Sequence, residues 1–231
     1  MEMNRHQQFK RFGLVLSLQA AIFSRLARHL NLHVWSIQTR PLYADYVLPE
    51  KHANNFEFKR LTLDDAVLAS NDPALGLSED FVRTAFKRRD ICVGAYHKES
   101  LVGYTWRSLS CAPITNGLWI RIDKQPQRYG YNALVREAFR GQRLSASITR
   151  FYDGHFVDAG IHSDVGYIAL HNLPSLVSSY RNGDRTLRGY AGYWKVGNRY
   201  WTFRTKGARK YIELESSDDL KDFISPTQLH I

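Results

Sequence analysis

The sequence predicts an α/β fold in which helices flank one mixed, mostly antiparallel sheet. Strand-like apolar runs alternate along the chain with segments whose apolar residues have helical spacing. Two pairs of strands are joined by tight polar turns, which indicates antiparallel hairpins. The chain of 231 residues is also long enough to bury a core without disulfides or metals.

The first 55 residues predict an N-terminal helix and strand that pack as an extension on the main domain. Apolar residues recur at helical spacing past two arginines: Phe12, Val15, Leu16, Ile22, Phe23, Leu26 and Leu30. Gln19 interrupts the apolar run and no clean cleavage site follows, which argues against a signal peptide. The segment is too short and polar to span a bilayer. A basic amphipathic helix can lie on a membrane surface, but we expect this one to pack on its own domain.

The main domain is expected over residues 56–215, followed by a polar tail over 216–231. Strands are expected at 56–61, 91–97, 101–109, 118–122, 129–135, 165–170, 186–196 and 199–205. Helices are expected at 63–69, after Ser78, at 142–160 and at 172–180, with Thr62 and Ser78 as N-caps.

The charge balance predicts an acidic partner. A net charge of +10 suits nucleic acid, anionic lipid, a phosphorylated cofactor or an acidic carrier protein, although a basic surface can also simply be solvated. Cys92 and Cys111 are isolated thiols, so we expect a reducing, cytoplasmic compartment. The histidines and cysteines lack metal-ligand spacing, and we expect no bound metal.

One stretch has the pattern of an anion site: Val135-Arg136-Glu137-Ala138-Phe139-Arg140-Gly141-Gln142-Arg143-Leu144-Ser145-Ala146. A strand leads through a basic turn into the start of a helix, whose first N–H groups lack intrahelical partners and attract phosphate. Gly141 lets the backbone approach an anion closely, and Arg140 and Arg143 add positive charge.

The order of elements, with three motifs, resembles the GNAT superfamily of N-acyltransferases over about residues 56–210. The hairpin from Cys92 to Tyr104 is similar to the family's second and third strands. The run from Val135 to Gln142 is similar to the segment before the family's pyrophosphate loop. Asn172-Leu173-Pro174-Ser175-Leu176 with Gly183 is similar to the family's last helix. The resemblance implies a GNAT fold and acetyl-CoA or another acyl-CoA as donor.

The resemblance also implies which residues bind the cofactor. Strand backbone from Asn132 to Val135, including Leu134, would pair with pantetheine, and Asn172 would touch the cofactor arm. The pyrophosphate would be held by the basic turn and the amides that follow it: Arg140, Gly141, Gln142, Arg143, Leu144, Ser145 and Ala146. The sequence departs from the family at Arg143 and Ser145, where glycine or alanine is usual, so a Cβ stands where backbone approaches phosphate.

Acylation of an amine needs a base for the ammonium and an acid for the departing thiolate. Tyr180 is the candidate acid, although Ser179 occupies the family's usual tyrosine position. Tyr131 and Asn132 either line the acceptor pocket or pair with neighbouring strands. The expected strand at 129–135, which is similar to the family's fourth strand, carries no carboxylate that could act as base.

The leading hypothesis is an N-acyltransferase that moves an acyl group from acyl-CoA to a primary amine of a small molecule. An acidic acyl carrier protein is an alternative donor, which the basic surface would suit. The chain could instead be a catalytically silent binding module. Its last hairpin mixes aromatic and basic residues, as in single-strand nucleic-acid binders, but we favour a half-buried amphipathic hairpin and expect no nucleic-acid partner.

Overall fold

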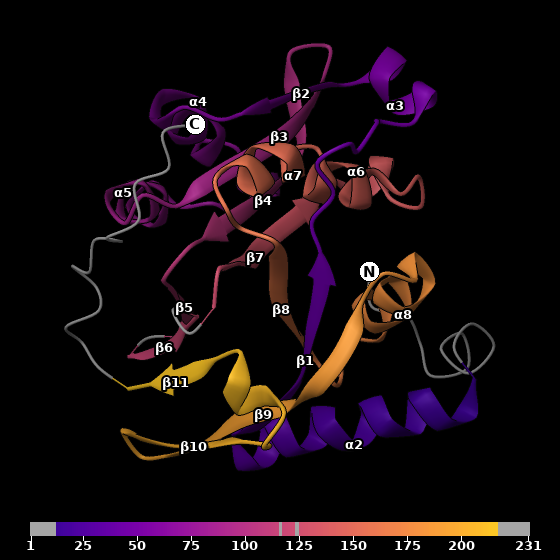
Figure 1. Cartoon of the computed structure of the whole chain (residues 1–231). Helices are drawn as coiled ribbons and strands as arrows, with labels where there is room; N and C mark the ends of the chain where they lie inside the picture. Colours follow the sequence, from indigo (N-terminus) through magenta and orange to yellow (C-terminus); the bar gives the residue numbers. More distant parts are fainter. Residues whose placement is uncertain (1–12, 116, 123–124, 217–231) are drawn as a thin grey trace. The chain divides into compact units, whose positions relative to one another are not determined.

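A computed structural model describes residues 13–115, 117–122 and 125–216, which form two compact units (Figure 1). The smaller unit contains residues 13–40 and 165–216, and the larger unit contains residues 41–164. The strands are mostly antiparallel and helices flank them, which confirms the fold class expected from the sequence. The tail expected at 216–231 lies almost wholly outside the described residues, and the expected domain boundaries stay predictions.

The larger unit is built on four antiparallel strands in the order β7-β4-β3-β2. These strands are β2 (Glu57–Arg60), β3 (Ile91–His97), β4 (Ser100–Ser108) and β7 (Gln127–Val135), and β5 (Cys111–Thr115) pairs with β6 (Leu118–Arg121) as a separate hairpin. Its helices are α3 (Glu50–Asn55), α4 (Leu63–Ser70), α5 (Glu79–Lys87), α6 (Leu144–Arg150) and α7 (Asp153–Asp158), with the short 3-10 turns η1 (Pro73–Leu75) and η2 (Glu137–Phe139).

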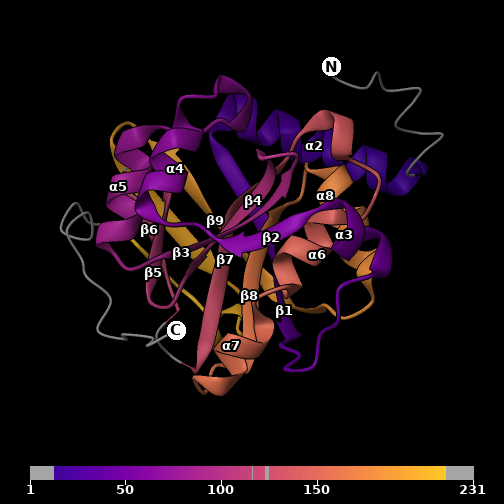
Figure 2. The ribbon, with the colours of Figure 1, turned by 90° about the horizontal axis from the view of Figure 1, so that it is seen from above.

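Helices cover both faces of this sheet, with α4 and α5 on one side and α6 on the other (Figure 2). Tyr104 and Trp106 of β4 face the first side, since the Tyr104 hydroxyl donates to the Leu75 carbonyl and Trp106 packs edge-on against Phe81. Gly103 faces the second side, because a Cβ there would lie 2.9 Å from the Ile148 Cδ1 atom of α6. Because successive side chains of β4 point to opposite faces of the sheet, this strand contributes to the hydrophobic packing on both faces.

The N-caps expected from the sequence are confirmed. Thr62 and Asp65 form a capping box at α4, in which the Asp65 N–H donates to the Thr62 hydroxyl and the Thr62 N–H donates to the Asp65 carboxylate. Ser78 accepts the Phe81 N–H at the start of α5. Each cap satisfies a backbone donor that a helix start leaves free, and each fixes where its helix begins.

Four strands of the smaller unit lie in the order β10-β9-β1-β8, and its short fifth strand, β11, is not part of that row. Its elements are α2 (Leu14–Leu30), β1 (Leu32–Pro41), β8 (Ser163–Ala169), α8 (Leu173–Asn182), β9 (Thr186–Val196), β10 (Arg199–Arg204), η3 (Ala208–Lys210) and β11 (Glu213–Glu215). The N-terminal helix and strand were expected, but β1 does more than extend the domain. It lies between β8 and β9 and pairs with β9 along its length, so it is an inner strand of this unit.

Three segments differ from the expectation. No helix or strand was expected at residues 50–55 and 111–115, but they form α3 and β5. Residues 142–160 were expected as one helix, but α6 ends at Arg150 and α7 begins at Asp153. The Thr149 carbonyl accepts the Arg128 guanidinium at 3.0 Å, so a buried side chain uses the acceptor that would continue the helix.

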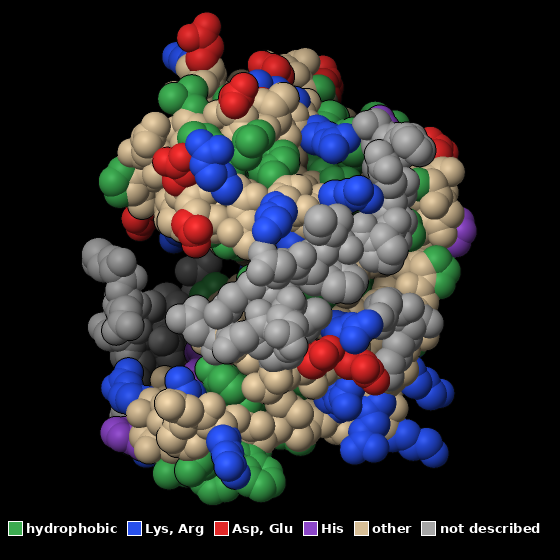
Figure 3. Space-filling view, turned by 90° about the vertical axis from the view of Figure 1, so that its left-hand side faces the viewer, with side chains coloured by type: hydrophobic (Ala, Val, Ile, Leu, Met, Phe, Trp, Pro, Cys, Tyr) green, Lys and Arg blue, Asp and Glu red, His purple; other side chains and the backbone are tan. Residues whose placement is uncertain are grey.

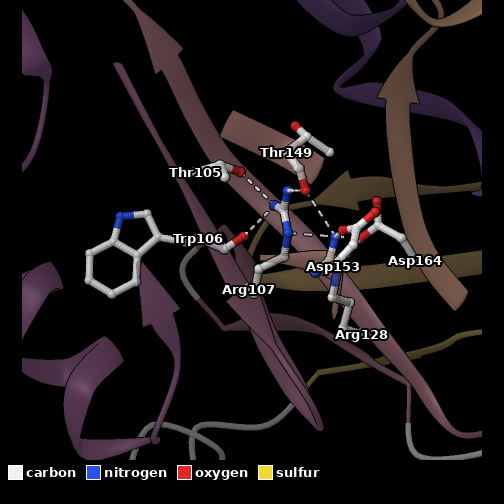
Figure 4. Close-up of polar contacts among 7 residues, drawn as sticks. All are labelled: Thr105, Trp106, Arg107, Arg128, Thr149, Asp153 and Asp164. Atoms are coloured by element: carbon white, nitrogen blue, oxygen red, sulfur yellow. Dashed lines mark hydrogen bonds and ion pairs between the residues drawn. The ribbon is translucent and has the colours of Figure 1, made fainter. Parts of the chain in front are cut away.

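A buried ionic network joins β7 to the end of α6 and the start of α7 (Figure 4). The Arg128 guanidinium contacts the carboxylates of Asp153 and Asp164, the latter at 3.2 Å, and all three side chains are at most 2% exposed. Arg107 of β4 joins the network through Asp164, at 3.9 Å. Two guanidinium groups therefore face two carboxylates, which balances the charge in a region without solvent.

Arg128→Met should destabilise the fold strongly, because it leaves two buried carboxylates with one guanidinium. We expect the free energy of unfolding, measured by urea denaturation, to fall by about 3–5 kcal/mol. Arg83→Met is the matched control, since it removes the exposed ion pair with Glu79 in α5 and should cost at most about 0.5 kcal/mol. Equal losses for the two variants would contradict a structural role for the network.

Candidate functional site

Strand β7 carries a bulge where the sequence predicts contact with the cofactor. Tyr131 lies opposite Trp106 and Leu134 lies opposite Tyr104, so β7 has one residue more than β4 over this stretch. Asn132, in the bulge, has a left-handed backbone with φ 41° and an exposed side chain. A bulge of this kind interrupts regular pairing and turns a short piece of backbone away from the neighbouring strand.

The connection from β7 to α6 is short, basic and exposed. After Val135, the 3-10 turn η2 leads to Arg140 in an extended conformation and then to Gly141, with φ 82° and open space where a Cβ would stand. The Arg140 Nε donates to the Val135 carbonyl at 3.0 Å, which folds this exposed arginine back along the loop. The loop therefore presents positive charge beside an unobstructed backbone.

Arg143 has a left-handed backbone, a conformation that glycine adopts far more readily than a residue with a Cβ. Its φ is 62° and its ψ is 16°, so it lies in the left-handed region immediately before α6. Such a conformation costs a residue with a Cβ roughly 1–2 kcal/mol. The side chain is exposed and has no hydrogen bond or ion pair within the described part of the chain. Arg143 therefore places a solvent-facing cation on a left-handed turn.

Helix α6 begins at Leu144, and its first internal backbone bonds are donated by Ala146 and Ser147 to the Arg143 carbonyl. The N–H groups of Leu144 and Ser145 precede these bonds. Leu144 is buried, whereas Ser145 is exposed. The predicted phosphate-binding residues thus form one continuous loop and helix start in the larger unit.

A buried histidine that no sequence pattern predicted supports this loop. His52 of α3 is 3% exposed, and its Nε2 donates to the Gln142 carbonyl at 2.9 Å. Its Nδ1 lies 2.7 Å from the Ser147 hydroxyl, which is itself 3.2 Å from the Tyr46 hydroxyl. Since the carbonyl can only accept, Nε2 carries a hydrogen, and Nδ1 shares a hydrogen bond with the Ser147 hydroxyl. One side chain therefore fixes both the loop and the first turn of α6.

The hydroxyl of Tyr131 belongs to a buried polar cluster. It donates to Asp90 at 2.6 Å and accepts from Arg88 at 3.2 Å, while Arg88 also binds Asp90 at 2.8 Å. Burial and the Asp90 carboxylate raise the pKa of Tyr131 well above its ordinary value. The phenol is therefore a neutral donor held by its own neighbours. Its predicted place in an acceptor pocket stays a prediction.

Two further predicted residues belong to the smaller unit. Asn172 is the N-cap of α8, where its side-chain oxygen accepts the Ser175 N–H at 3.3 Å. Tyr180 lies on the same helix with 59% of its surface exposed. Ser179, in the position where the family usually has tyrosine, is buried and bonded to Gln38. Tyr180 is thus the phenol of α8 that solvent reaches, and its catalytic role stays a prediction.

The remaining features of the surface do not add to this site. A depression of about 450 Å³ lies between the end of α3 and the β3–β4 turn, and none of the predicted site residues lines it. Among the residues that the structure describes, no group of three or more His, Cys, Asp or Glu side chains is placed to hold a metal.

The sequence matches no protein-family model and no curated protein. A solved structure of a functionally unknown conserved protein from Staphylococcus epidermidis is similar over 94% of this chain and 69% of its own, with 10% identity and a TM-score of 0.46. A putative GNAT-family acetyltransferase from Novosphingobium aromaticivorans is 12% identical, with a TM-score of 0.43; the match covers 69% of this chain and 61% of that protein, less than two thirds of its length. A putative acetyltransferase from Acinetobacter baylyi is 15% identical, with a TM-score of 0.43; the match covers 71% of this chain and 92% of that protein. The similarity is confined to the arrangement of the elements.

Replacing His52 should loosen the β7–α6 loop. His52→Leu leaves the Gln142 carbonyl and the Ser147 hydroxyl without their buried partner, so the free energy of unfolding should fall by about 2 kcal/mol or more. We also expect amide hydrogen exchange at residues 142–145 to become roughly tenfold faster in the native protein.

Two variants serve as controls for this experiment. His52→Gln keeps a side-chain donor and should retain part of the protection, whereas His155→Leu, at an exposed position of α7, should leave exchange in the loop unchanged. If His52→Leu exchanges at the wild-type rate at residues 142–145, His52 does not hold the loop.

Proposed function

We propose that the protein is an N-acyltransferase that moves an acetyl or other acyl group from acyl-CoA to a primary amine. The β7–α6 connection carries this proposal. A bulged strand leads into an exposed loop with a left-handed residue at Arg143, and the loop ends on helix N–H groups that precede the first intrahelical bonds. The run from Val135 to Gln142 within this stretch resembles the segment that precedes the GNAT pyrophosphate loop.

The loop has the chemistry that a diphosphate requires. Backbone N–H groups at Leu144 and Ser145 can donate to phosphate oxygens, and the partial charge of the helix start favours an anion there. Arg140 and Arg143 add two exposed guanidinium groups close in sequence to these donors. His52 and Ser147 hold the backbone in this shape before any ligand binds, which lowers the ordering cost of binding.

In the proposed reaction the amine nitrogen attacks the thioester carbonyl, a C–N bond forms and the C–S bond breaks. The amine loses a proton to water, because β7 offers no carboxylate that could serve as base. The thiolate leaving group takes a proton from the Tyr180 phenol, which regains it from solvent. The exposure of Tyr180 is compatible with that exchange. Variable loops would select the amine, which we take to be a small molecule.

Acetyl-CoA should stabilise the protein against heat, and Arg143 should contribute charge to its binding. Arg143→Gly relieves the left-handed backbone and removes the guanidinium, so stability should not fall while affinity for acetyl-CoA drops by about threefold to tenfold. Arg89→Gly is the matched control, because Arg89 is another exposed arginine with a left-handed backbone, at φ 66°. It should leave affinity unchanged.

Thermal denaturation and isothermal titration with acetyl-CoA measure both quantities. The absence of any shift in melting temperature with acetyl-CoA and with longer acyl-CoAs would rule out the proposal and favour a silent binding module. Equal affinity losses for Arg143→Gly and Arg89→Gly would remove Arg143 from the site but leave the proposal intact.

Tyr180→Phe should lower kcat while leaving KM for acetyl-CoA nearly unchanged, because it removes a proton donor from the chemical step. We expect kcat to fall by roughly 100-fold. The assay measures the free thiol released from acetyl-CoA in the presence of an amine. Tyr190→Phe, an equally conservative change at another exposed tyrosine, should have no effect. A wild-type kcat for Tyr180→Phe would show that solvent protonates the thiolate.

A further inference from the structure

The positive charge of the protein is concentrated in the smaller unit. The smaller unit, residues 13–40 and 165–216, contains twelve basic residues (Lys or Arg) and three acidic ones (Asp or Glu). The larger unit, residues 41–164, contains sixteen basic and fifteen acidic residues. From Arg185 to Tyr211 the sequence has basic residues and no acidic one. The net charge of +10 is thus a property of one unit rather than of the whole surface.

Helix α2 in this unit has its apolar face turned to solvent. Leu14, Val15 and Leu18 are 67%, 78% and 56% exposed, and Ile22, one turn further along, is also exposed. The buried side of the helix contains Ser17 and Ala20 instead. An ordinary surface helix has the opposite arrangement, and single exposed leucines would need no explanation, but a stripe over two turns indicates a binding surface.

The β9–β10 hairpin of the same unit has an exposed aromatic face. Trp194 and Trp201 lie directly opposite each other and are 50% and 63% exposed, so their rings share one face of the hairpin. Phe203 lies on that face too, and is also exposed. At the hairpin turn Arg199 lies on that face and Lys195 on the opposite face, and both are exposed.

Helix α2 and the aromatic face of the hairpin meet at the C-terminal end of the helix. Helix α2 ends at Leu30, Leu32 pairs with Trp194, and the Lys195 N–H donates to the Asn31 carbonyl at 3.2 Å. Arg25 and Arg28 are exposed in the last turns of α2. Figure 3 shows hydrophobic side chains open to solvent, with Lys and Arg beside them, at the lower edge of the view, where Figure 1 has α2 and β10.

We propose that this apolar and basic surface docks on the face of an anionic lipid bilayer. Aliphatic side chains can enter the boundary between headgroups and acyl chains, tryptophan prefers that boundary, and Lys and Arg attract anionic headgroups. Nucleic acid would use the charge and the aromatic rings, but it offers nothing to the aliphatic stripe of α2. The aliphatic side chains therefore decide between the two partners.

The docking is peripheral. Helix α2 has 17 residues, and none of the helices in the described part of the chain is long and apolar enough to cross a bilayer. A single helix with a few inserted side chains binds reversibly, and the basic residues supply the second contribution that stable attachment needs. The proposal concerns a surface outside the β7–α6 loop and stands whether or not the protein is an acyltransferase.

Sedimentation with vesicles tests the proposal. The full-length protein should bind vesicles of phosphatidylcholine with about 30% phosphatidylserine at least tenfold more tightly than phosphatidylcholine alone, and about 0.5 M salt should largely remove the difference. Leu18→Glu and the double variant Lys195→Glu/Arg199→Glu should each weaken binding by roughly tenfold or more.

Matched controls lie in the larger unit. Leu68→Glu changes a leucine that is 72% exposed on α4, and Lys51→Glu/Lys98→Glu reverses two exposed charges; both should bind vesicles like the wild type. The proposal is overturned if the wild type does not sediment with anionic vesicles, or if Leu68→Glu weakens binding as much as Leu18→Glu. It is also overturned if a single-stranded oligonucleotide binds more tightly than the vesicles and Leu18→Glu leaves that binding unchanged. Light scattering that shows a dimer, dissociated by Leu18→Glu and indifferent to vesicles, would instead assign the surface to a second copy of the chain.

Discussion

The buried guanidinium of Arg128 is the contact on which the geometry of the larger unit depends. It lies on β7, yet its partners belong to other elements. They are the Thr149 carbonyl near the end of α6, Asp153 at the start of α7 and Asp164 at the start of β8. A charge without solvent must keep its partners, so β7 and the two helices cannot slide past each other without breaking several contacts at once. The β7–α6 loop therefore starts and ends on elements whose spacing is fixed.

Within that fixed frame the loop is held in a shape that its residues do not favour by themselves. Asn132 and Arg143 both have left-handed backbones, and such conformations persist only where the surroundings impose them. His52 supplies part of that constraint from α3 through the Gln142 carbonyl. The exposed arginines of the loop are consequently displayed by a preorganised backbone, a property that suits a binding site more than a simple connection between elements.

Local patterns in the sequence predicted local structure well. Thr62 and Ser78 marked helix starts, and the tight polar turn between the expected strands 186–196 and 199–205 marked the last hairpin, because caps and tight turns depend on a few neighbouring residues. The break between α6 and α7 and the support from His52 could not be foreseen, since both depend on partners far along the chain. The sequence pattern predicted a turn leading into a helix at the β7–α6 loop, but only the backbone angles revealed that Arg143 is left-handed.

The inner position of β1 has a consequence for how the chain is made. Its partner β9 is synthesised last among the long strands, with the whole larger unit between them in sequence. During translation β1 therefore remains unpaired until β9 has been synthesised, while residues 41–164 can already fold on the ribosome. Such a long-range pairing forms slowly. The nascent chain should consequently need protection of its N-terminal strand from other chains, because an unpaired strand edge is a template for pairing.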